Sequence, residues 1–392
     1  MPILVDETGE IIAGHARLLA AEANSFKSYP VVVARDWTEA QKRSARLRDN
    51  QRGLMSSWDV TLIKCEIADL KLLQYDMPLL SFPESQLRGW GISYGPESKQ
   101  DPEAVPDRPK KPVVRKGDLW ILGDHRLLCG NAMAVSDMAK CFGGIKPKLL
   151  VTSPPYNQKI DGFKPSGMHK EGDWVKKVGT LAYSDDVPED EYQKQQCALL
   201  AAWYSALPDG ASIFYNHKNR YREKRVISPL AWILSSPFVL RQEIIWSRPG
   251  SITQNARMFL PSDERIYWLY KGNDFTFNDD TDIKTWSSVW NISPVANLDH
   301  AVAFPVEIPR RAIIAVSTTS DRIFDPFVGS GTTIIAAEMT GRKALAIEID
   351  PGCVQISIER WQTFTGKKAT LDGQTLEEVA KARKRKGNGA AT

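Results

Sequence analysis

Residues 322–337 read RIFDPFVGSGTTIIAA, and this stretch decides the fold. A short apolar run ends at Asp325, two glycines follow at Gly329 and Gly331, and a second apolar run begins at Thr332. The pattern predicts a buried strand, a glycine turn, and a helix capped by Thr332 or the threonine after it. Such glycines let a ligand approach the backbone, and a helix N-terminus offers unpaired N–H groups and a positive dipole end.

The next apolar run, ALAIEID at 344–350, places Glu348 at the end of the following strand. An acidic residue at this point can accept hydrogen bonds from ribose hydroxyls. We predict a nucleoside site here because a strand, a glycine turn, a helix, a second strand and a terminal acidic residue follow one another in that order. The Gly-Lys-Ser/Thr sequence of a P-loop is missing from the turn, which argues against nucleoside triphosphate hydrolysis.

A second buried strand runs into LLVTSPPYN at 149–157, where two prolines follow Ser153. Successive prolines fix φ and remove two backbone donors, so the loop leaves the sheet in a rigid extended shape with outward carbonyls. With the hydroxyl of Ser153 and the ring of Tyr156, this loop offers acceptors and a stacking face that suit a planar amine. An ordinary Pro-Pro turn after a strand is the alternative interpretation.

The alternation of strand and helix patterns after the first third of the chain predicts an α/β fold. We expect a doubly wound, mostly parallel, Rossmann-like sheet covered on both faces. The expected strands lie at 149–152, 211–216, 239–246, 265–270, 322–325 and 343–350. The expected helices lie at 189–207, 222–234, 305–316 and 332–340.

Composition divides the chain into parts. Residues 91–112 are rich in proline and charge with little apolar content, which is typical of an inter-domain linker. Upstream, residues 1–90 predict a small α+β domain, with Thr38 as the N-cap of a helix. Downstream, we expect the α/β domain at 113–370 and a basic flexible tail at 371–392, which contains the run KARKRK.

Two long stretches interrupt the α/β pattern. The first, 157–188, is rich in Gly, Lys and Asp, and we expect a mobile loop whose lysines contact phosphates. The second, 251–298, is polar and aromatic, and we expect a recognition element there.

The overall composition excludes several classes of protein. The 392 residues carry a net charge of only +4, so bulk charge does not indicate nucleic acid. The five cysteines are scattered without a Cys-x-x-Cys pair, which argues against a disulfide framework and against a zinc site, and we expect no metal. No apolar run approaches the roughly 20 residues of a membrane helix. We therefore expect a cytoplasmic protein.

Together the two motifs resemble those of the amino-group DNA methyltransferases that use S-adenosylmethionine. In that family a Pro-Pro-aromatic loop binds the target base and a DPFxGSGTT loop binds the methyl donor. The target loop comes first here, an order that resembles the permuted β group. The resemblance covers about residues 116–369, including a stretch at 300–314 before the donor loop and a final helix at 358–369.

The resemblance implies a role for each matching residue. Asp325 and Phe327 would meet the methionine part of the donor, and Glu348 its ribose. The implied donor-binding set is Asp325, Pro326, Phe327, Gly329, Ser330, Gly331, Thr332 and Glu348. The implied catalytic set, which holds the flipped base, is Ser153, Pro154, Pro155 and Tyr156.

One departure from the family pattern concerns the donor's adenine. The family has Gly-Asp where this chain has Gly130-Asn131, and the acid accepts from the adenine amine. Asn131 still offers a carbonyl oxygen, so we expect weaker donor affinity rather than loss of binding.

The chemistry predicted is direct attack of an exocyclic amine on the sulfonium methyl. Methylation of a ring carbon needs a cysteine nucleophile, normally in a Pro-Cys pair, and no cysteine here follows a proline. A target atom inside a stacked duplex requires the base to be turned out. Serine at the first position of the target loop is linked more often to N4 of cytosine than to N6 of adenine, and both bases stay open.

Recognition of duplex DNA is assigned to the second interruption and its margin. Guanidinium and amide groups there can read base edges, and the candidates are Arg248, Gln254, Asn255 and Arg257. A homodimer and a companion restriction enzyme are partners on which the sequence is silent.

The N-terminal part resembles the later portion of a ParB/sulfiredoxin-like domain, N-terminally incomplete, through the turn at 14–17. There a helix N-terminus and Arg17 could hold a phosphate. Two further hypotheses remain: a ParB-like DNA-binding adaptor with a degenerate methyltransferase domain, and an enzyme of the same chemistry acting on RNA or on a glutamine side chain.

Overall fold

The computed structural model describes most of the chain in two compact units. The described residues are 2–51, 63, 65–67, 69–70, 75, 101–157, 187–222, 224–248, 259, 261–278, 283, 286–294 and 304–388. The first unit comprises Met1–Tyr94 with Asp279–Trp286, and the second comprises Gly95–Asn278 with Ser287–Thr392.

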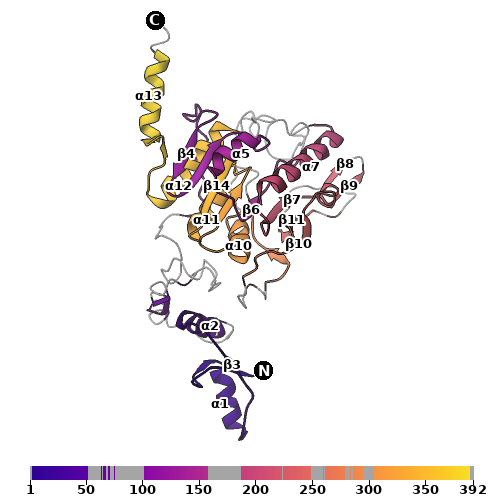
Figure 1. Cartoon of the computed structure of the whole chain (residues 1–392), viewed down its shortest axis with the longest axis vertical. Helices are drawn as coiled ribbons and strands as arrows, with labels where there is room; N and C mark the ends of the chain where they lie inside the picture. The colour runs from indigo at the N-terminus through magenta and orange to yellow at the C-terminus, as the bar shows by residue number, and fades with distance from the viewer. Residues whose placement is uncertain are drawn as a thin grey trace. The chain divides into compact units, whose positions relative to one another are not determined.

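A large sheet with a parallel centre organises the second unit (Figure 1). The central strands, in spatial order, are β7 (Ser212–His217), β6 (Leu149–Thr152), β13 (Arg322–Asp325), β14 (Lys343–Glu348) and β5 (His125–Cys129). Beyond β7 lie β11 (Asp263–Tyr270), β10 (Val239–Ser247) and β12 (Val289–Asn291). Beyond β5 lie β4 (Leu119–Leu122), β15 (Thr370–Leu371) and β16 (Gln374–Thr375). Because β11 and β4 run antiparallel to the centre, the sheet is mixed at its margins.

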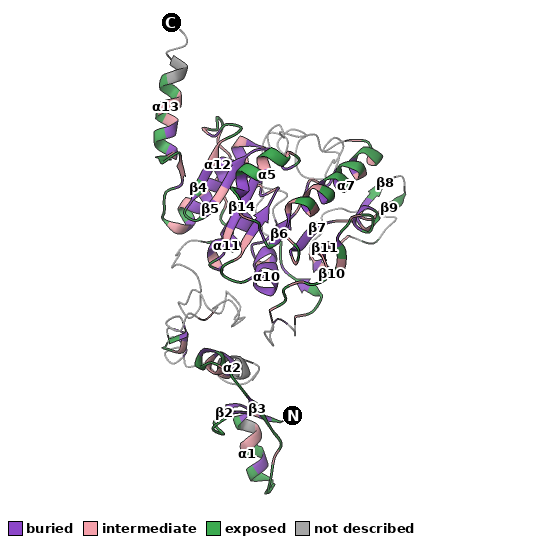
Figure 2. Cartoon of the chain, in the orientation of Figure 1, coloured by how far each residue is buried: buried purple, intermediate pink, exposed green. Residues whose placement is uncertain are grey.

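Helices cover both faces of this sheet, which is why central strands such as β6 are continuously apolar. One face packs against α5 (Val135–Phe142), α7 (Glu189–Ala206) and α8 (Leu230–Ile233). The helices α10 (Glu307–Val316), α11 (Thr332–Met339) and α12 (Pro351–Thr365) pack against one another, with α11 and α12 on β14. Figure 2 shows the buried strands, with exposed outer sides on α5 and α7, whereas α10 and α11 are buried almost throughout. The predicted α/β, doubly wound architecture is confirmed.

The strand order reverses between β6 and β13. From β6 the chain continues to β7 on one side, whereas β13 continues to β14 on the other. In open α/β sheets, ligands bind outside the carboxyl ends of the strands at such a reversal. The loops that follow β6 and β13 are the two motifs identified in the sequence.

Two predicted elements differ from the structure. The helix expected over 222–234 is a hairpin of β8 (Arg220–Arg222) and β9 (Arg225–Ile227), followed only by the short α8. Lys224 turns the hairpin at φ +63°, and a long helix would not accommodate Pro229 in its interior. Within the interruption expected over 251–298, the strand expected at 265–270 is present as β11, and the unexpected β12 adds a further strand to the sheet.

The expected linker and tail are also more ordered than predicted. The described part of the linker, 101–112, belongs to the second unit, where Arg108 binds both carboxylate oxygens of Asp350 at 2.8 and 2.9 Å. The tail contains α13 (Leu376–Asn388), and Arg383 of this helix binds Asp118 at 2.8 Å. Charged side chains in both segments therefore form specific ion pairs with the second unit.

The predicted mobile loop 157–188 lies outside the described residues between 158 and 186, but its two ends are described. The side-chain amide of Asn157 donates to the carbonyl of Val187 and accepts from its N–H, both at 2.9 Å. Asn157 is buried and left-handed at φ +53°. We call this pair the Asn157–Val187 clamp.

The first unit is a small α+β structure. A three-stranded sheet has the order β2 (Ile11–Ala13), β1 (Ile3–Asp6), β3 (Val31–Ala34), and the helices are α1 (His15–Ala23) and α2 (Glu39–Gln51). Thr38 caps α2 as predicted, because its hydroxyl accepts from the N–H of Gln41 at 3.2 Å. The guanidinium of Arg17 donates to the carbonyl of Pro2. The likeness to ParB remains a prediction. None of the helices in the described parts of either unit is long and apolar enough to cross a membrane.

Candidate active site

The loops after β6 and β13 meet at the strand reversal. Phe324 of β13 pairs with Leu150 of β6 in parallel register, so both strands end at the same edge. The hydroxyl of Thr152 donates to the carboxylate of Asp325 at 2.8 Å, and both side chains are buried. The residue before Ser153 is thus bonded to the residue that opens the glycine turn. The convergence of two motifs 173 positions apart is present in the structure.

Asp325 organises the glycine turn from inside. Its two oxygens accept from Thr152, from the N–H of Phe327 at 3.0 Å and from the hydroxyl of Thr333 at 2.5 Å. Burial raises the pKa of Asp325 to about 6, and these donors act in the opposite direction. The predicted donor ligand is therefore fully engaged within the loop, and its side chain is 1% exposed.

The expected threonine cap of α11 is wrong. Gly331 is the N-cap, in the left-handed region at φ +87°, and no side chain caps the helix. Thr333 instead bonds Asp325, and the hydroxyl of Thr332 accepts from the guanidinium of Arg360 at 3.1 Å. The first turn of α11 therefore keeps backbone N–H groups that no side-chain cap takes up.

Glu348 closes the other side of the turn. One oxygen accepts from the N–H of Gly329 at 3.0 Å and the other from the N–H of Asp350 at 2.9 Å. Burial raises the pKa of Glu348 to about 7. Desolvation opposes its charge, and ribose hydroxyls would supply donors that favour the charge.

Arg360 supports the donor loop from α12. Besides Thr332, its guanidinium donates to the carbonyl of Ser330 at 3.2 Å and to the carbonyl of Pro102 at 2.6 Å. Burial lowers the pKa of Arg360 to about 10. The segment that follows residue 101 is thereby anchored to the loop, together with the pair of Arg108 and Asp350.

Asn131 is placed at the end of β5, beside β14. Its side-chain oxygen, the predicted adenine acceptor, accepts from the N–H of Met133 at 2.9 Å. Its backbone N–H donates to Asp137 at 2.7 Å. The oxygen therefore has one of its two lone pairs engaged in a local turn.

The target loop contains a polar cluster that sequence analysis did not find. The hydroxyl of Tyr156 lies 2.7 Å from Ser153 Oγ, 2.7 Å from Asn216 Nδ2 and 3.0 Å from Glu264 Oε2. Asn216 Nδ2 also donates to Glu264 at 2.9 Å. Burial, and next the charge of Glu264, raise the pKa of Tyr156 well above its ordinary value. We refer to Ser153, Tyr156, Asn216 and Glu264 as the target-loop cluster.

The sheet topology explains this cluster. Asn216 is the next-to-last residue of β7 and Glu264 is the second residue of β11, and Asn216 pairs with Ile266, two residues after Glu264. Because β11 runs antiparallel to β7, its start lies beside the end of β7, at the same edge of the sheet as the end of β6. Only strand order, which sequence spacing does not show, could have identified Glu264.

The ring of Tyr156 presents little free face. Only 8% of the residue is exposed, its ring centroid lies 4.5 Å from that of His217, and the ammonium of Lys218 lies 5.7 Å above it. Behind the loop, the hydroxyl of Tyr192 lies 2.6 Å from the carbonyl of Pro155 and 2.7 Å from His217. Burial lowers the pKa of His217 to about 3, so the ring stays neutral.

Residues 148–359, more than half of the chain, match the family model described as DNA methylase. The chain belongs to the DNA methylase family. The match contains both loops and the predicted identification of an amino-group (N6/N4) methyltransferase family is confirmed.

Individual relatives are more distant. This DNA methylase is 28% identical over 134 residues to the type II methyltransferase M.Cfr9I of Citrobacter freundii, covering 31% of this chain and 44% of that protein. It is 28% identical over 180 residues to the DNA adenine methyltransferase YhdJ of Escherichia coli K12, covering 38% and 59%. The chain thus spans less than two thirds of either relative. A solved structure of the cytosine-N4-specific PvuII DNA methyltransferase has a TM-score of 0.47 at 15% identity, covering 71% of this chain and 96% of that one.

The candidate base-reading residues of this DNA methylase are placed only in part. The guanidinium of Arg248 donates to the second oxygen of Glu264 and lies 4.9 Å above the ring of Trp246. Three further candidates lie outside the described residues: Gln254, Asn255 and Arg257.

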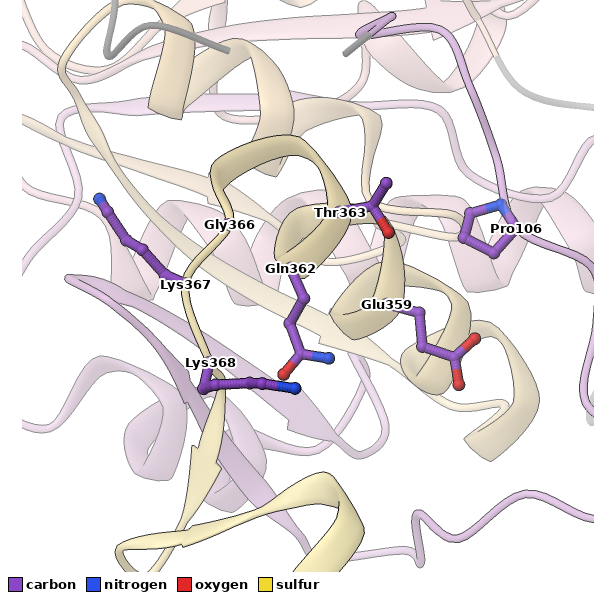
Figure 3. Close-up of a pocket in the computed structure, with 7 residues that line it drawn as sticks. All are labelled: Pro106, Glu359, Gln362, Thr363, Gly366, Lys367 and Lys368. Atoms are coloured by element: carbon purple, nitrogen blue, oxygen red, sulfur yellow. The ribbon is translucent and has the colours of Figure 1, made fainter. Parts of the chain in front are cut away.

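A cavity of about 440 Å³ lies elsewhere in the methylase domain (Figure 3). Its lining comes from the end of α12 and the residues after it, with Pro106, and neither motif loop contributes. Two lysines that line it are already paired, Lys367 with Glu338 at 3.1 Å and Lys368 with Glu377 at 2.7 Å. Because its lining contains no residue of either motif loop, we do not assign the reaction to this cavity.

Proposed function

We propose that this protein is an S-adenosylmethionine-dependent DNA methyltransferase that acts on an exocyclic amino group of a base turned out of duplex DNA. The single observation that carries the proposal is the hydrogen bond of 2.8 Å between Thr152 and Asp325. This bond joins the loops after β6 and β13, and it supports the proposal that one of them holds the base and the other the methyl donor. Membership of the DNA methylase family supports the same activity.

The glycine turn after β13 has space and polar groups that suit the methyl donor. Apart from its chain neighbours, no described residue has an atom within 4 Å of the position that a Cβ at Gly329 would occupy, which leaves room beside the backbone. The start of α11 lies next to that space, and the buried Glu348 lies beneath it. We assign Glu348 to the ribose hydroxyls, the side chain of Asn131 to the adenine ring, and Phe327 to the methionine part. When bound, S-adenosylmethionine supplies the methyl group to the amine nitrogen, its C–S electron pair stays on sulfur, and the amine loses one proton to solvent.

The target loop orients the amine. We assign Ser153 Oγ and the carbonyl of Pro154 as acceptors for its two N–H groups, which localises the nitrogen lone pair and fixes the line of attack. Pro155 holds the loop rigid, and its carbonyl is bound by Tyr192. The base would lie against the ring of Tyr156. Stacking of this kind offsets part of the cost of unstacking the base, which is a few kcal/mol.

N4 of cytosine is the favoured target because the loop begins with serine. The second candidate, N6 of adenine, is favoured by the likeness to a relative named a DNA adenine methyltransferase. Mass spectrometry of nucleosides from DNA incubated with the protein and the methyl donor will distinguish N4-methylcytosine from N6-methyladenine.

Transfer of radioactive methyl groups tests the activity itself. Duplex DNA should be labelled, whereas RNA and protein should not. Ser153→Ala should reduce DNA labelling by about 100-fold, as the loss of a transition-state acceptor does, and Ser205→Ala on the exposed side of α7 should leave it unchanged. Labelling of RNA or protein alone would refute the proposal.

A further inference from the structure

A continuous hydrogen-bond chain links Ser153 to a buried carboxylate. Ser153 Oγ lies 2.7 Å from the hydroxyl of Tyr156, and that hydroxyl lies 3.0 Å from Glu264 Oε2. Glu264 is 5% exposed, although no sequence motif marks it. Its other oxygen pairs with the guanidinium of Arg248, so a charged group stands at the end of the chain.

The number of protons available fixes the direction of this chain. A carboxylate only accepts, so the single hydroxyl proton of Tyr156 is donated to Glu264. The oxygen of Tyr156 then accepts from Asn216 Nδ2 and from the hydroxyl of Ser153. With its own proton directed inward, Ser153 Oγ meets Asn216 Nδ2 at 3.4 Å with one lone pair and keeps the other for a donor that comes from outside.

The orientation of the Asn216 side chain leaves one of its own polar atoms without a hydrogen bond in the described part of the chain while it donates toward Tyr156 and Glu264. Its amide nitrogen faces Tyr156 and Glu264, an orientation that the carboxylate requires because only the nitrogen can donate. Its side-chain oxygen is consequently buried without a hydrogen-bond partner among the described residues. A buried acceptor without a partner is destabilising. The cluster therefore keeps the donors directed toward Glu264 rather than satisfying every polar atom.

We propose that Glu264 is a positioning residue that acts through the Tyr156 hydroxyl to hold Ser153 Oγ as a hydrogen-bond acceptor for the target amine. Coupled hydrogen bonds polarise one another, so the charge also strengthens Ser153 as an acceptor. A neutral serine thereby gains part of the effect of a carboxylate at the first position of the loop. The inference rests on the proposed amine methylation and extends it.

Substitution of Glu264 by glutamine tests the mechanism. The amide of Glu264→Gln can donate to Tyr156, which then donates to Ser153 and consumes its remaining lone pair. We expect kcat for DNA methylation to fall about tenfold, in line with the loss of a charged acceptor, with KM for S-adenosylmethionine unchanged. Glu264→Asp, which keeps the charge, should recover most of kcat.

A double-substitution cycle separates this role from a structural one. Tyr156→Phe removes the intermediate hydroxyl, so Glu264→Gln should have little further effect in that background. The matched control is Glu243→Gln. The carboxylate of Glu243 lies on β10 and pairs with Arg265 rather than with Tyr156, so its removal should not change kcat. In protein with ¹³C-labelled tyrosine, the Cζ resonance that Tyr156→Phe removes should shift in Glu264→Gln but not in Glu243→Gln.

The outcomes are distinct. Additive effects of the two substitutions, an unchanged kcat in Glu264→Gln, or an unmoved Tyr156 resonance would each overturn the role of Glu264 while methylation by the unsubstituted protein stands. Absence of DNA methylation by the unsubstituted protein would overturn both the proposed function and this inference.

Discussion

Single side chains join the two halves of the site. Thr152 precedes the target loop, yet its hydroxyl donates to Asp325 in the donor loop. The hydroxyl of Thr333, in the first turn of α11, donates to the other oxygen of the same carboxylate. A buried carboxylate that draws donors from three chain segments fixes their relative positions. The relative position of the loops after β6 and β13 thus depends on the hydrogen bonds that Asp325 accepts.

Thr152→Val is the isosteric test of this joint. It removes one donor from Asp325 without changing volume, so we expect the free energy of unfolding to fall by about 1–3 kcal/mol, as for a buried acceptor that loses a partner. Urea denaturation measures it. Thr363→Val, at an exposed position of α12, is the control, and equal effects of the two substitutions would contradict the joint.

Glu348 should make donor binding depend on pH. Its pKa is raised from 4.5 to about 7, so the folded protein retains a proton that the unfolded chain has lost. The contribution of this residue to folding stability therefore falls as the pH rises from about 4.5 to about 7. Donor binding should follow the opposite direction, because ribose hydroxyls donate to the carboxylate. Calorimetry should show about tenfold tighter binding at about pH 8 than at about pH 6, and Glu348→Gln should bind weakly at both.

At the scale of elements, the glycine turn depends on two glycines with different constraints. Gly331 is left-handed at φ +87°, and a Cβ there would lie 3.1 Å from the side chain of Ser357. Gly329 is left-handed at φ +54°, but its Cβ position is open.

Gly331→Ala should therefore destabilise the protein more than Gly329→Ala. Backbone strain alone costs about 1 kcal/mol for a residue with a side chain, and the contact with α12 adds to it at Gly331. Thermal and urea unfolding of both variants will measure the difference. A larger effect at Gly329 would mean that the packing of α11 on α12 is not what restricts this turn.

Strands that are buried on both faces could be predicted from the sequence. Charged residues that join the site only through the order of the strands could not. The bounds of β6 and β13 match the prediction because LLVT and RIFD are short apolar runs that end at a polar residue. Glu264 was missed because it stands among other charged residues at a strand start and becomes a site residue only through the strand order. The hairpin at 220–227 was missed because its apolar spacing also fits a helix.

At the scale of the whole molecule, the second unit extends further toward the N-terminus than composition indicates. Residues 101–113 contact α12 and its N-cap through Arg108, the carbonyl of Pro102 and the N–H of Val113, which donates to Gln355 at 2.7 Å. A segment that is poor in apolar residues is thus fixed by charge and backbone contacts.

Two truncations test this assignment. A chain that begins at Gly95 should keep the melting temperature of the second unit and its donor binding. A chain that begins at Arg115 should melt at a lower temperature and bind the donor more weakly, because hydrogen bonds to charged groups contribute about 1.5–3 kcal/mol each. Equal melting temperatures would show that the segment does not stabilise the unit.

The Asn157–Val187 clamp has a consequence for how this architecture tolerates variation. The buried side-chain amide of Asn157 holds the backbone of Val187, so the described residues on either side of 158–186 are fixed to each other. Closing a longer excursion costs little, about 0.6 kcal/mol for each doubling of its length. Insertions and deletions between those ends should therefore leave the geometry around Ser153 intact, so that selection can redesign one without retuning the other.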